Sequence, residues 1–488
     1  MKENIFELCR HAYKLEEEGN KNYLYDEVGG AYIPTTRKKI ITKAIRFSKE
    51  LKEKKGKNIA VYVSISSQWL VAFLGVVFSG NVAVLLDKRF PDDMIFTHMK
   101  NTDCTDIVYD TISEQLREKL KYTYGVIPIN RYAETTEETE FNINECDVCE
   151  EEESMCAILC TSGTTGKSNY VCLSQKNIGS NIRHTINYCK YTAEDSFVGI
   201  LPPAHVFGMA QVMISPFFLG CKTLFTSSLA NLFENMQKFK PTAVIMTPML
   251  AEYICFRLEA IHKKNPDIPR RQIAQKMLGE NIHYMPVGGA AIKVQPVKIL
   301  QAYGILVRVG YGMTETGSVI TVNMLDDNNY TVVGKCIDCM EIKVVEGEIF
   351  VKGASVMLGY YKNEVQTLEV LQDGWLATGD LGYITEDGYC YLTGRKKNLI
   401  VLSNGENISP ERLEQMLLVY PLIKEVCVRE KNDRIIAEIF TENESTDKDT
   451  VKKIIEEINM KLPFYSKIMD FELRKNEFKK NMNGKIVR

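Results

Sequence analysis

The chain has 488 residues, of which 45% are apolar and 25% charged, and its formal net charge is −3. This length predicts about two to four folded units with sizeable cores. The near balance of charge gives no reason to expect nucleic acid or an anionic membrane as a partner. The best apolar run, Trp69 to Phe78, is too short to span a bilayer and suits a buried helix followed by a buried strand. We therefore expect no nucleic-acid partner and no integral membrane association.

The fourteen cysteines, in a chain whose acidic N-terminus lacks the apolar core of a signal peptide, predict free thiols in a reducing cytoplasm. The two CxxC pairs, Cys146/Cys149 and Cys336/Cys339, lie too far apart in sequence for a zinc ribbon. The six histidines show no ligand spacing. No metal site made only of protein ligands is indicated.

Short apolar segments alternate with helical patterns from about residue 40 to residue 330, as in NIAVYVSIS, VAVLLD, MCAILC, SFVGILP, TAVIMTP and IHYMPVGG. This alternation predicts largely parallel sheets covered on both faces. From about 331 to 394 the pattern changes to short alternating strands and turns, such as EGEIFVKG and EDGYCYLTG. These predict a small antiparallel sheet or barrel.

A different unit is expected after Gly394. It opens with the strand NLIVLS, and Ser409-Pro410 then marks a helix start, with serine as N-cap and proline in the first turn. Two strands, KEVCVRE and RIIAEIF, precede a second helix with an apolar face at helical spacing. That face consists of Val451, Ile454, Ile455, Ile458 and Leu462. The pattern predicts a small α+β domain that ends in a polar tail.

The stretch TSGTTGKS, residues 161–168, ends like a P-loop, the phosphate cradle of many ATPases. A P-loop, however, begins with glycine and leads directly into a helix. Here Thr161 holds the first position, and the strand-like run NYVCLS follows. We expect a hairpin whose tip, rich in hydroxyls and glycine, wraps phosphates. A plain Ser/Thr/Gly turn is the alternative from these residues alone.

Seven motifs in order carry a resemblance to the adenylate-forming (AMP-binding) superfamily, which includes acyl-CoA synthetases. They are LCTSGTTGK, PPAHVFG at 202–208, VGGAAI at 287–292, YGMTETG at 311–317, DGWLATGDLG at 373–382, LTGRKKNLIVLSNGENISPERLE at 392–414, and the closing NGKIVR. The resemblance implies an α/β fold with a large N-terminal domain, residues 1–394, of two doubly wound sheets plus a small β-barrel. It also implies a mobile α+β C-terminal domain, residues 395–488, with a hinge near Lys397.

The implied activity has two half-reactions. A carboxylate attacks the α-phosphate of ATP to give acyl-AMP and pyrophosphate, and a thiol then attacks the acyl carbon and expels AMP. Neither step needs a protein nucleophile, so positioning and charge stabilisation would carry the catalysis. The implied cofactors are ATP, Mg²⁺ and coenzyme A, or the phosphopantetheine of a carrier protein.

The resemblance also assigns nucleotide contacts. The β- and γ-phosphates would be held by Thr161, Ser162, Gly163, Thr164, Thr165 and Gly166. Glu315 would ligate Mg²⁺, and Thr314 would lie near the α-phosphate. Tyr311 would stack on adenine, flanked by Gly312 and Met313. Close backbone approach to the nucleotide is expected at Gly288, Gly289 and Ala290. Asp380 would accept both ribose hydroxyls, with Arg395 as a second ribose or phosphate contact.

Two further groups belong to the small domain. Lys485 would bridge the carboxylate and the α-phosphate during adenylation, where it would neutralise two anions that repel each other. Rotation about Lys397 would then withdraw Lys485 and bring the turn Gly405, Glu406 and Asn407 to the site, where it would line a thiol tunnel.

The acid pocket would be closed at its carboxylate end by His205 and lined by Val206, Phe207 and Gly208. An amino-acid substrate is disfavoured, because the neighbouring Pro202, Pro203 and Ala204 offer no carboxylate for an ammonium group. The sequence of residues 394–411 is closest to that of long-chain fatty acyl-CoA synthetases, so we expect a fatty acid, with an aryl acid as the alternative.

One departure from the family pattern concerns the phosphate loop. The family writes TSGTTGxPKG, whereas Asn169 stands here in place of the lysine and Lys167 comes two residues early. Lys167 would substitute for that lysine, or pyrophosphate handling would be weaker. Three alternatives stay open: an acyl-AMP ligase that loads a carrier protein, a weakened nucleotide-binding homologue and, more distantly, a P-loop NTPase.

Overall fold

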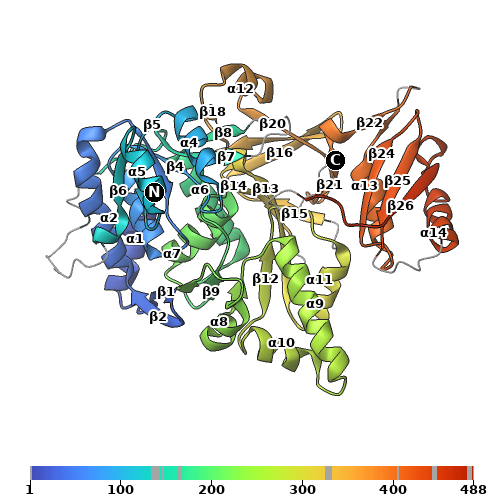
Figure 1. Ribbon diagram of the computed structural model, residues 1–488, viewed down its shortest axis with the longest axis horizontal. Coiled ribbons are helices and arrows are strands. Elements are labelled where there is room, and N and C mark those ends of the chain that lie inside the picture. The colour runs from blue at the N-terminus through green and yellow to red at the C-terminus, as the bar shows by residue number, and fades with distance from the viewer. Residues whose placement is uncertain are drawn as a thin grey trace.

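Two large sheets organise most of the molecule (Figure 1). The computed structural model describes residues 3–132, 143, 148–161, 168–324, 332–403, 406–441, 448–480 and 486. Within these residues it is a mixed α/β protein, and the predicted fold class is confirmed.

The first sheet changes from parallel to antiparallel part-way along. Its parallel part has the strand order β1-β10-β9-β11-β12-β13, with β2 antiparallel at the edge. The antiparallel part continues through β14-β15-β21-β20-β17-β16, with β19 paired to β20. The strands in chain order are β1 (Leu24–Val28), β2 (Ala31–Thr35), β9 (Ser196–Gly199), β10 (Lys222–Phe225), β11 (Ala243–Val244), β12 (Tyr284–Val287), β13 (Leu306–Met313), β14 (Ser318–Val322), β15 (Val332–Cys336), β16 (Met340–Val345), β17 (Glu348–Gly353), β19 (Leu371–Gln372), β20 (Trp375–Ile384) and β21 (Cys390–Arg395). The alternating strands predicted from residue 331 onward are thus antiparallel, and they extend this sheet.

The second sheet has the order β18-β8-β7-β4-β3-β5-β6. Its strands are β3 (Asn58–Tyr62), β4 (Val82–Leu85), β5 (Cys104–Tyr109), β6 (Gly125–Pro128), β7 (Met155–Thr161), β8 (Asn169–Ser174) and β18 (Gly359–Tyr360). β7 and β8 are antiparallel, with Thr161 opposite Asn169. The hairpin predicted around TSGTTGKS is therefore confirmed in its two stems. The P-loop reading is wrong, because strand β8 follows Ser168 and a helix begins only at Gln175.

The main helices of the N-terminal part are α1 (Ile5–Glu17), α2 (Arg37–Leu51), α3 (Ser67–Phe78), α4 (Asp92–Asn101), α5 (Glu114–Lys121), α6 (Gln175–Cys189), α7 (Ser215–Leu219), α8 (Leu232–Phe239), α9 (Pro248–Lys264), α10 (Arg270–Leu278), α11 (Val294–Ala302) and α12 (Glu364–Val370). α3 is buried along the whole predicted run from Trp69 to Phe78. A helix that is apolar all round belongs inside a core. No helix within the described ranges combines the length and the apolar character needed to cross a bilayer.

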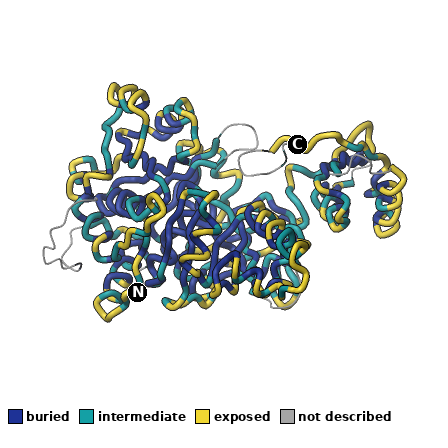
Figure 2. The backbone as a smooth tube through the Cα atoms, turned by 60° about the horizontal axis from the view of Figure 1, so that its bottom comes forward, coloured by how far each residue is buried: buried dark blue, intermediate teal, exposed yellow. Residues whose placement is uncertain are grey.

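The residues after Ile400 build their own hydrophobic cluster, which appears as a second buried centre in Figure 2. Their elements are β22 (Ile400–Val401), β23 (Asn407–Ile408), α13 (Pro410–Leu418), β24 (Glu425–Glu430), β25 (Ile435–Phe440), α14 (Lys448–Asn459) and β26 (Asp470–Arg474). Ser409 caps α13 as predicted, since its hydroxyl accepts a hydrogen bond from the Arg412 amide. The domain boundary at residues 394/395 and the hinge at Lys397 stay predictions.

A buried guanidinium fixes the start of α2 against the end of α7. Arg37 is 2% exposed and donates to the carbonyls of Phe217 (2.7 Å) and Cys221 (2.6 Å), as well as to those of Pro216 and Asn22. Burial lowers the pKa of Arg37 to about 10. The guanidinium thus adds a charged donor to carbonyls at the end of α7, beside the backbone amides of Gly220 and Cys221 that bond to Phe217 and Pro216.

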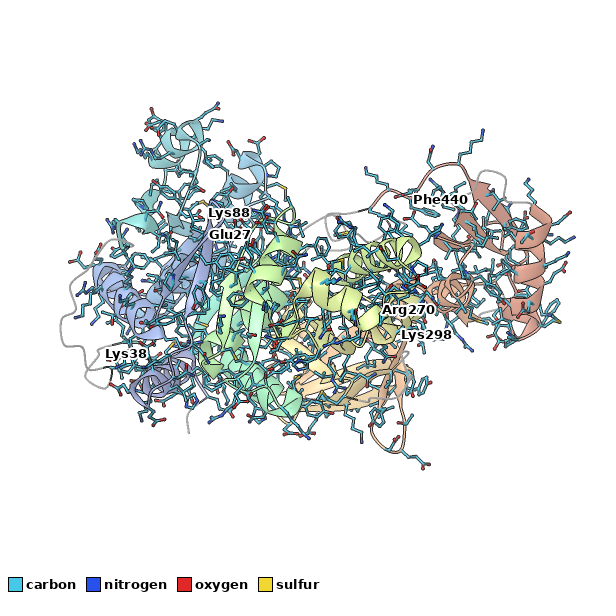
Figure 3. All side chains as sticks on the ribbon, turned by 90° about the horizontal axis from the view of Figure 1, so that it is seen from below. Glu27, Lys38, Lys88, Arg270, Lys298 and Phe440 are labelled. Carbon is cyan, nitrogen blue, oxygen red and sulfur yellow. The ribbon has the colours of Figure 1, made fainter. Side chains whose placement is uncertain are left out.

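We expect Arg37→Met to lower the free energy of unfolding by at least about 3 kcal/mol, because several carbonyls around the buried guanidinium each lose a charged hydrogen-bond donor at once. The matched control is Lys38→Met at the next position, where the lysine is labelled in Figure 3 and makes a solvent-exposed pair with Glu17. Urea unfolding of both variants checks this. Equal losses in the two would contradict the role given to Arg37.

Candidate functional site

Three of the residues predicted to contact the nucleotide bring their side chains together from strands β13, β20 and β21. The Tyr311 hydroxyl donates to Asp380 Oδ2 at 2.9 Å, and Arg395 Nε lies 2.6 Å from Asp380 Oδ1. Asp380 is 5% exposed and stands opposite Arg395 in the β20–β21 ladder. A carboxylate has about four acceptor positions, which is the chemistry that accepting two ribose hydroxyls requires. Burial, with the Asp380 charge, raises the pKa of Tyr311 well above its usual value.

Glu315 lies beside this cluster in a single turn, Thr314–Thr316, directly after β13. Its carboxylate is 8% exposed and accepts a hydrogen bond from the Tyr360 hydroxyl at 2.9 Å. Burial raises the pKa of Glu315 and the Asp380 charge adds to this, whereas Tyr360 and Arg395 act in the opposite direction. A buried carboxylate of this kind gains from a cation. One carboxylate together with nucleotide phosphates is also a usual magnesium donor set, so the residues present fit the metal.

The PPAHVFG and VGGAAI motifs touch each other. A Cβ added at Gly288 would lie 3.1 Å from Phe207 Cζ, and one at Gly208 would lie 2.1 Å from the Pro202 carbonyl oxygen. Only glycine therefore fits at position 208, whereas a larger residue at position 288 would require the Phe207 ring to shift by a few tenths of an ångström. Gly289 has φ +82°, in the region that favours glycine. Val206 and Gly208 are buried, and Gly208 opens a π-helical turn, Gly208–Ile214.

Asp87 holds the ring of His205 and also pairs with the nearby Arg89; the sequence singled out neither residue. The His205 Nε2 lies 3.1 Å from Asp87 Oδ2 and 3.0 Å from Arg89 Nη2. Asp87 is 2% exposed and also pairs with Arg89 at 2.6 Å. Burial alone would raise the pKa of Asp87, but the hydrogen bonds from His205 and Arg89 hold it well below its usual range. His205 is thus fixed by a buried carboxylate at the end of β4.

The other predicted residues are placed as follows. Thr161 ends β7, and its hydroxyl lies 3.5 Å from the Asn169 carbonyl. Ala290, Gly312, Met313 and Thr314 are partly buried next to the motifs described above. Lys397 is exposed, and Glu406 and Asn407 lie on the β22–β23 hairpin. Eight further predicted residues lie outside the part of the chain that the structure describes: Ser162, Gly163, Thr164, Thr165, Gly166, Lys167, Gly405 and Lys485.

The residues missed from the sequence are Asp87, Arg89 and Tyr360. Asp87 and Arg89 had a weak signal, because charged residues directly follow the buried strand VAVLL. Tyr360 had none, since a tyrosine after glycine also suits an ordinary turn.

Comparison with known proteins then decides the family. The AMP-binding enzyme family matches residues 16–361, and the family of the AMP-binding enzyme C-terminal domain matches residues 397–488. The chain belongs to the AMP-binding enzyme family. The resemblance inferred from the seven motifs is therefore confirmed.

Among relatives of this AMP-binding enzyme is the long-chain-fatty-acid–CoA ligase FadD15 of Mycobacterium bovis, 29% identical over 309 residues, or 56% of this chain and 51% of the relative. The chain thus spans about half the length of that relative. The 2-succinylbenzoate–CoA ligase of Bacillus cytotoxicus is 28% identical over 403 residues, 78% of this chain and 77% of the relative. Among solved structures, O-succinylbenzoate coenzyme A synthetase (MenE) from Bacillus subtilis, in complex with ATP and magnesium ion, has a TM-score of 0.78 at 21% identity, covering 98% of each chain. That likeness shows the fold.

The lowered pKa of Asp87 makes a pH-dependent prediction. A depressed carboxyl pKa stabilises the folded state above the unfolded value of about 3.9, and this contribution is lost as the pH falls below it. We expect Asp87→Asn to lower the free energy of unfolding by about 1 to 3 kcal/mol at neutral pH. The difference in the free energy of unfolding between Asp87→Asn and the unmodified protein should become smaller below about pH 4. Urea unfolding across this range measures it.

Asp93→Asn is the control for this experiment, because Asp93 is exposed in the first turn of α4. A loss in Asp87→Asn no larger than in Asp93→Asn at neutral pH would contradict the account of the buried pair.

Proposed function

We propose that this AMP-binding enzyme activates a fatty or aryl carboxylic acid with ATP to acyl-AMP, releases pyrophosphate, and transfers the acyl group to the thiol of coenzyme A. The observation that carries the proposal is the meeting of Tyr311, Asp380 and Arg395 beside the buried Glu315. These side chains come from three separate motifs. The names of the two relatives, both CoA ligases, support the same reaction.

In this proposal the nucleotide is held chiefly by fixed groups. Asp380, oriented by Tyr311 and Arg395, accepts the ribose hydroxyls, and the hydroxyl-rich hairpin tip after Thr161 wraps the outer phosphates. Glu315 holds Mg²⁺, which when bound neutralises phosphate charge. Because Asp380 and Glu315 are already oriented by their hydrogen bonds, these two groups need little reorganisation as charge develops at the α-phosphate.

The acid would lie between His205 and the Gly288–Gly289 turn, where Phe207 and Val206 offer apolar surface. His205 is fixed by Asp87, so it can keep one orientation toward the carboxylate end of the acid. Lys485 would neutralise the acid and the α-phosphate, and rotation at Lys397 would exchange it for the turn at 405–407. A reducing cytoplasm is part of the same proposal, in agreement with cysteines that form no disulfide among the described residues.

The first test is exchange of labelled pyrophosphate into ATP across a panel of saturated, unsaturated and aryl acids. We expect exchange only when a suitable acid is present, because the first half-reaction is reversible and needs no thiol. Adding coenzyme A, and in a separate arm a carrier protein with phosphopantetheine, identifies the acceptor. No exchange with any acid, despite ATP binding, would favour a weakened nucleotide-binding homologue.

The second test concerns Lys485. We expect Lys485→Ala to slow adenylation at least about a hundredfold, as loss of a transition-state charge contact does, and to leave thioester formation from supplied acyl-AMP largely intact. The neighbouring Lys480→Ala is the control, because Lys480 pairs with Glu425 and Glu477. Equal loss of both half-reactions in Lys485→Ala would refute its assigned role.

A further inference from the structure

A short segment, residues 357–361, joins Glu315 to the hairpin that carries the phosphate loop. The Met357 amide donates to the Glu315 carbonyl at 2.8 Å, and the Leu358 amide donates to the Cys172 carbonyl at 2.9 Å. The Tyr361 amide donates to the Tyr170 carbonyl at 2.8 Å. The segment therefore touches the turn of Glu315 at one end and β8 along the rest.

Tyr360 is fixed within this segment by its backbone. It stands opposite Val171 in the β18–β8 ladder, and its amide donates to Thr367 Oγ1 at 2.9 Å. Gly359 before it has φ +141°, and a Cβ there would lie 2.8 Å from Thr367 Cγ2. These contacts fix the Tyr360 backbone, and its partly buried side chain packs against the main hydrophobic core, so the hydroxyl has a defined position.

The Tyr360 hydroxyl donates to Glu315 Oε1 at 2.9 Å. A phenol hydroxyl is a donor at neutral pH without any special environment. A carboxylate held through one oxygen keeps one orientation, and its Oε2 then points in a set direction. Loss of a group that orients a metal ligand in this way typically weakens metal binding by roughly 10- to 100-fold.

We propose that Tyr360 is a positioning residue, which orients Glu315 for Mg²⁺ and fixes it relative to the β7–β8 hairpin. This inference rests on the proposed function, in that it takes Glu315 as the residue that holds the metal with ATP. Beyond that function, we infer that Tyr360, on the second sheet, sets the geometry of Glu315, which directly follows strand β13 of the first sheet.

The chain supplies a matched control at the next position. Tyr361 also belongs to the segment, but its hydroxyl donates to Asp103 Oδ2 at 2.8 Å and accepts from Asn58 Nδ2 at 2.9 Å. Tyr361→Phe therefore removes one hydroxyl and one pair of hydrogen bonds from the same segment without touching Glu315.

The test measures Mn²⁺ binding to the protein with ATP by electron paramagnetic resonance, and the Mg²⁺ dependence of pyrophosphate exchange. For Tyr360→Phe we expect the Mn²⁺ dissociation constant, and the Mg²⁺ concentration for half-maximal exchange, to rise roughly tenfold or more. Saturating Mg²⁺ should restore most of the rate. Tyr361→Phe should leave both metal constants unchanged.

Two outcomes would overturn the proposal: metal constants for Tyr360→Phe that equal those of Tyr361→Phe, or a lower rate at every Mg²⁺ concentration with unchanged metal constants. In a Glu315→Gln background the effect of Tyr360→Phe on Mn²⁺ binding should vanish, and its persistence there would also count against the proposal.

The binding measurement needs no turnover. A protein without acid-dependent exchange would thus refute the proposed function, while the Mn²⁺ constants would still decide the role of Tyr360.

Discussion

The burial of two carboxylates at one place constrains the whole site. Asp380 and Glu315 are 5% and 8% exposed, and the charge of Asp380 makes ionisation of Glu315 harder. An isolated buried carboxylate is strongly disfavoured unless donors or cations compensate it. Arg395, Tyr311 and Tyr360 supply that compensation here, and each comes from a different strand. Asp380 meets Tyr311 and Arg395 within the first sheet, whereas Glu315 receives the Tyr360 hydroxyl only if the two sheets meet correctly.

The place of this cluster follows from the topology of the first sheet. β13 is parallel to β12 on one side and antiparallel to β14 on the other, and the β13–β14 register shifts between Tyr311 and Gly312. A Cβ at Gly312 would lie 1.7 Å from the Ser318 carbonyl oxygen, so only glycine permits this close approach. Such an irregularity re-aims the chain beyond it. The turn with Glu315 is thereby directed toward the second sheet, where Tyr360 and the β7–β8 hairpin lie.

Local patterns were enough to predict the elements and several motif positions. The buried helix α3, the hairpin β7–β8 and the serine cap of α13 each follow from a few adjacent residues, because apolar period and capping chemistry act locally. Asp87 and Tyr360 could not be found in this way. The residues that they contact in the site lie far away along the chain. His205 is more than a hundred positions from Asp87, and Glu315 is forty-five positions from Tyr360. A single sequence gives the period of a strand but not the polar group that it will meet.

We propose that the β7–β8 hairpin and the buried acids Asp380 and Glu315 serve the cleavage of ATP at its α-phosphate. Identification of the nucleotide product tests this most directly, with ATP labelled at the α-phosphate, a suitable carboxylic acid, Mg²⁺ and coenzyme A. The account predicts AMP and pyrophosphate in amounts equal to the acyl thioester formed, and no cleavage without the acid. Formation of ADP and inorganic phosphate, or cleavage that does not depend on the acid, would contradict it.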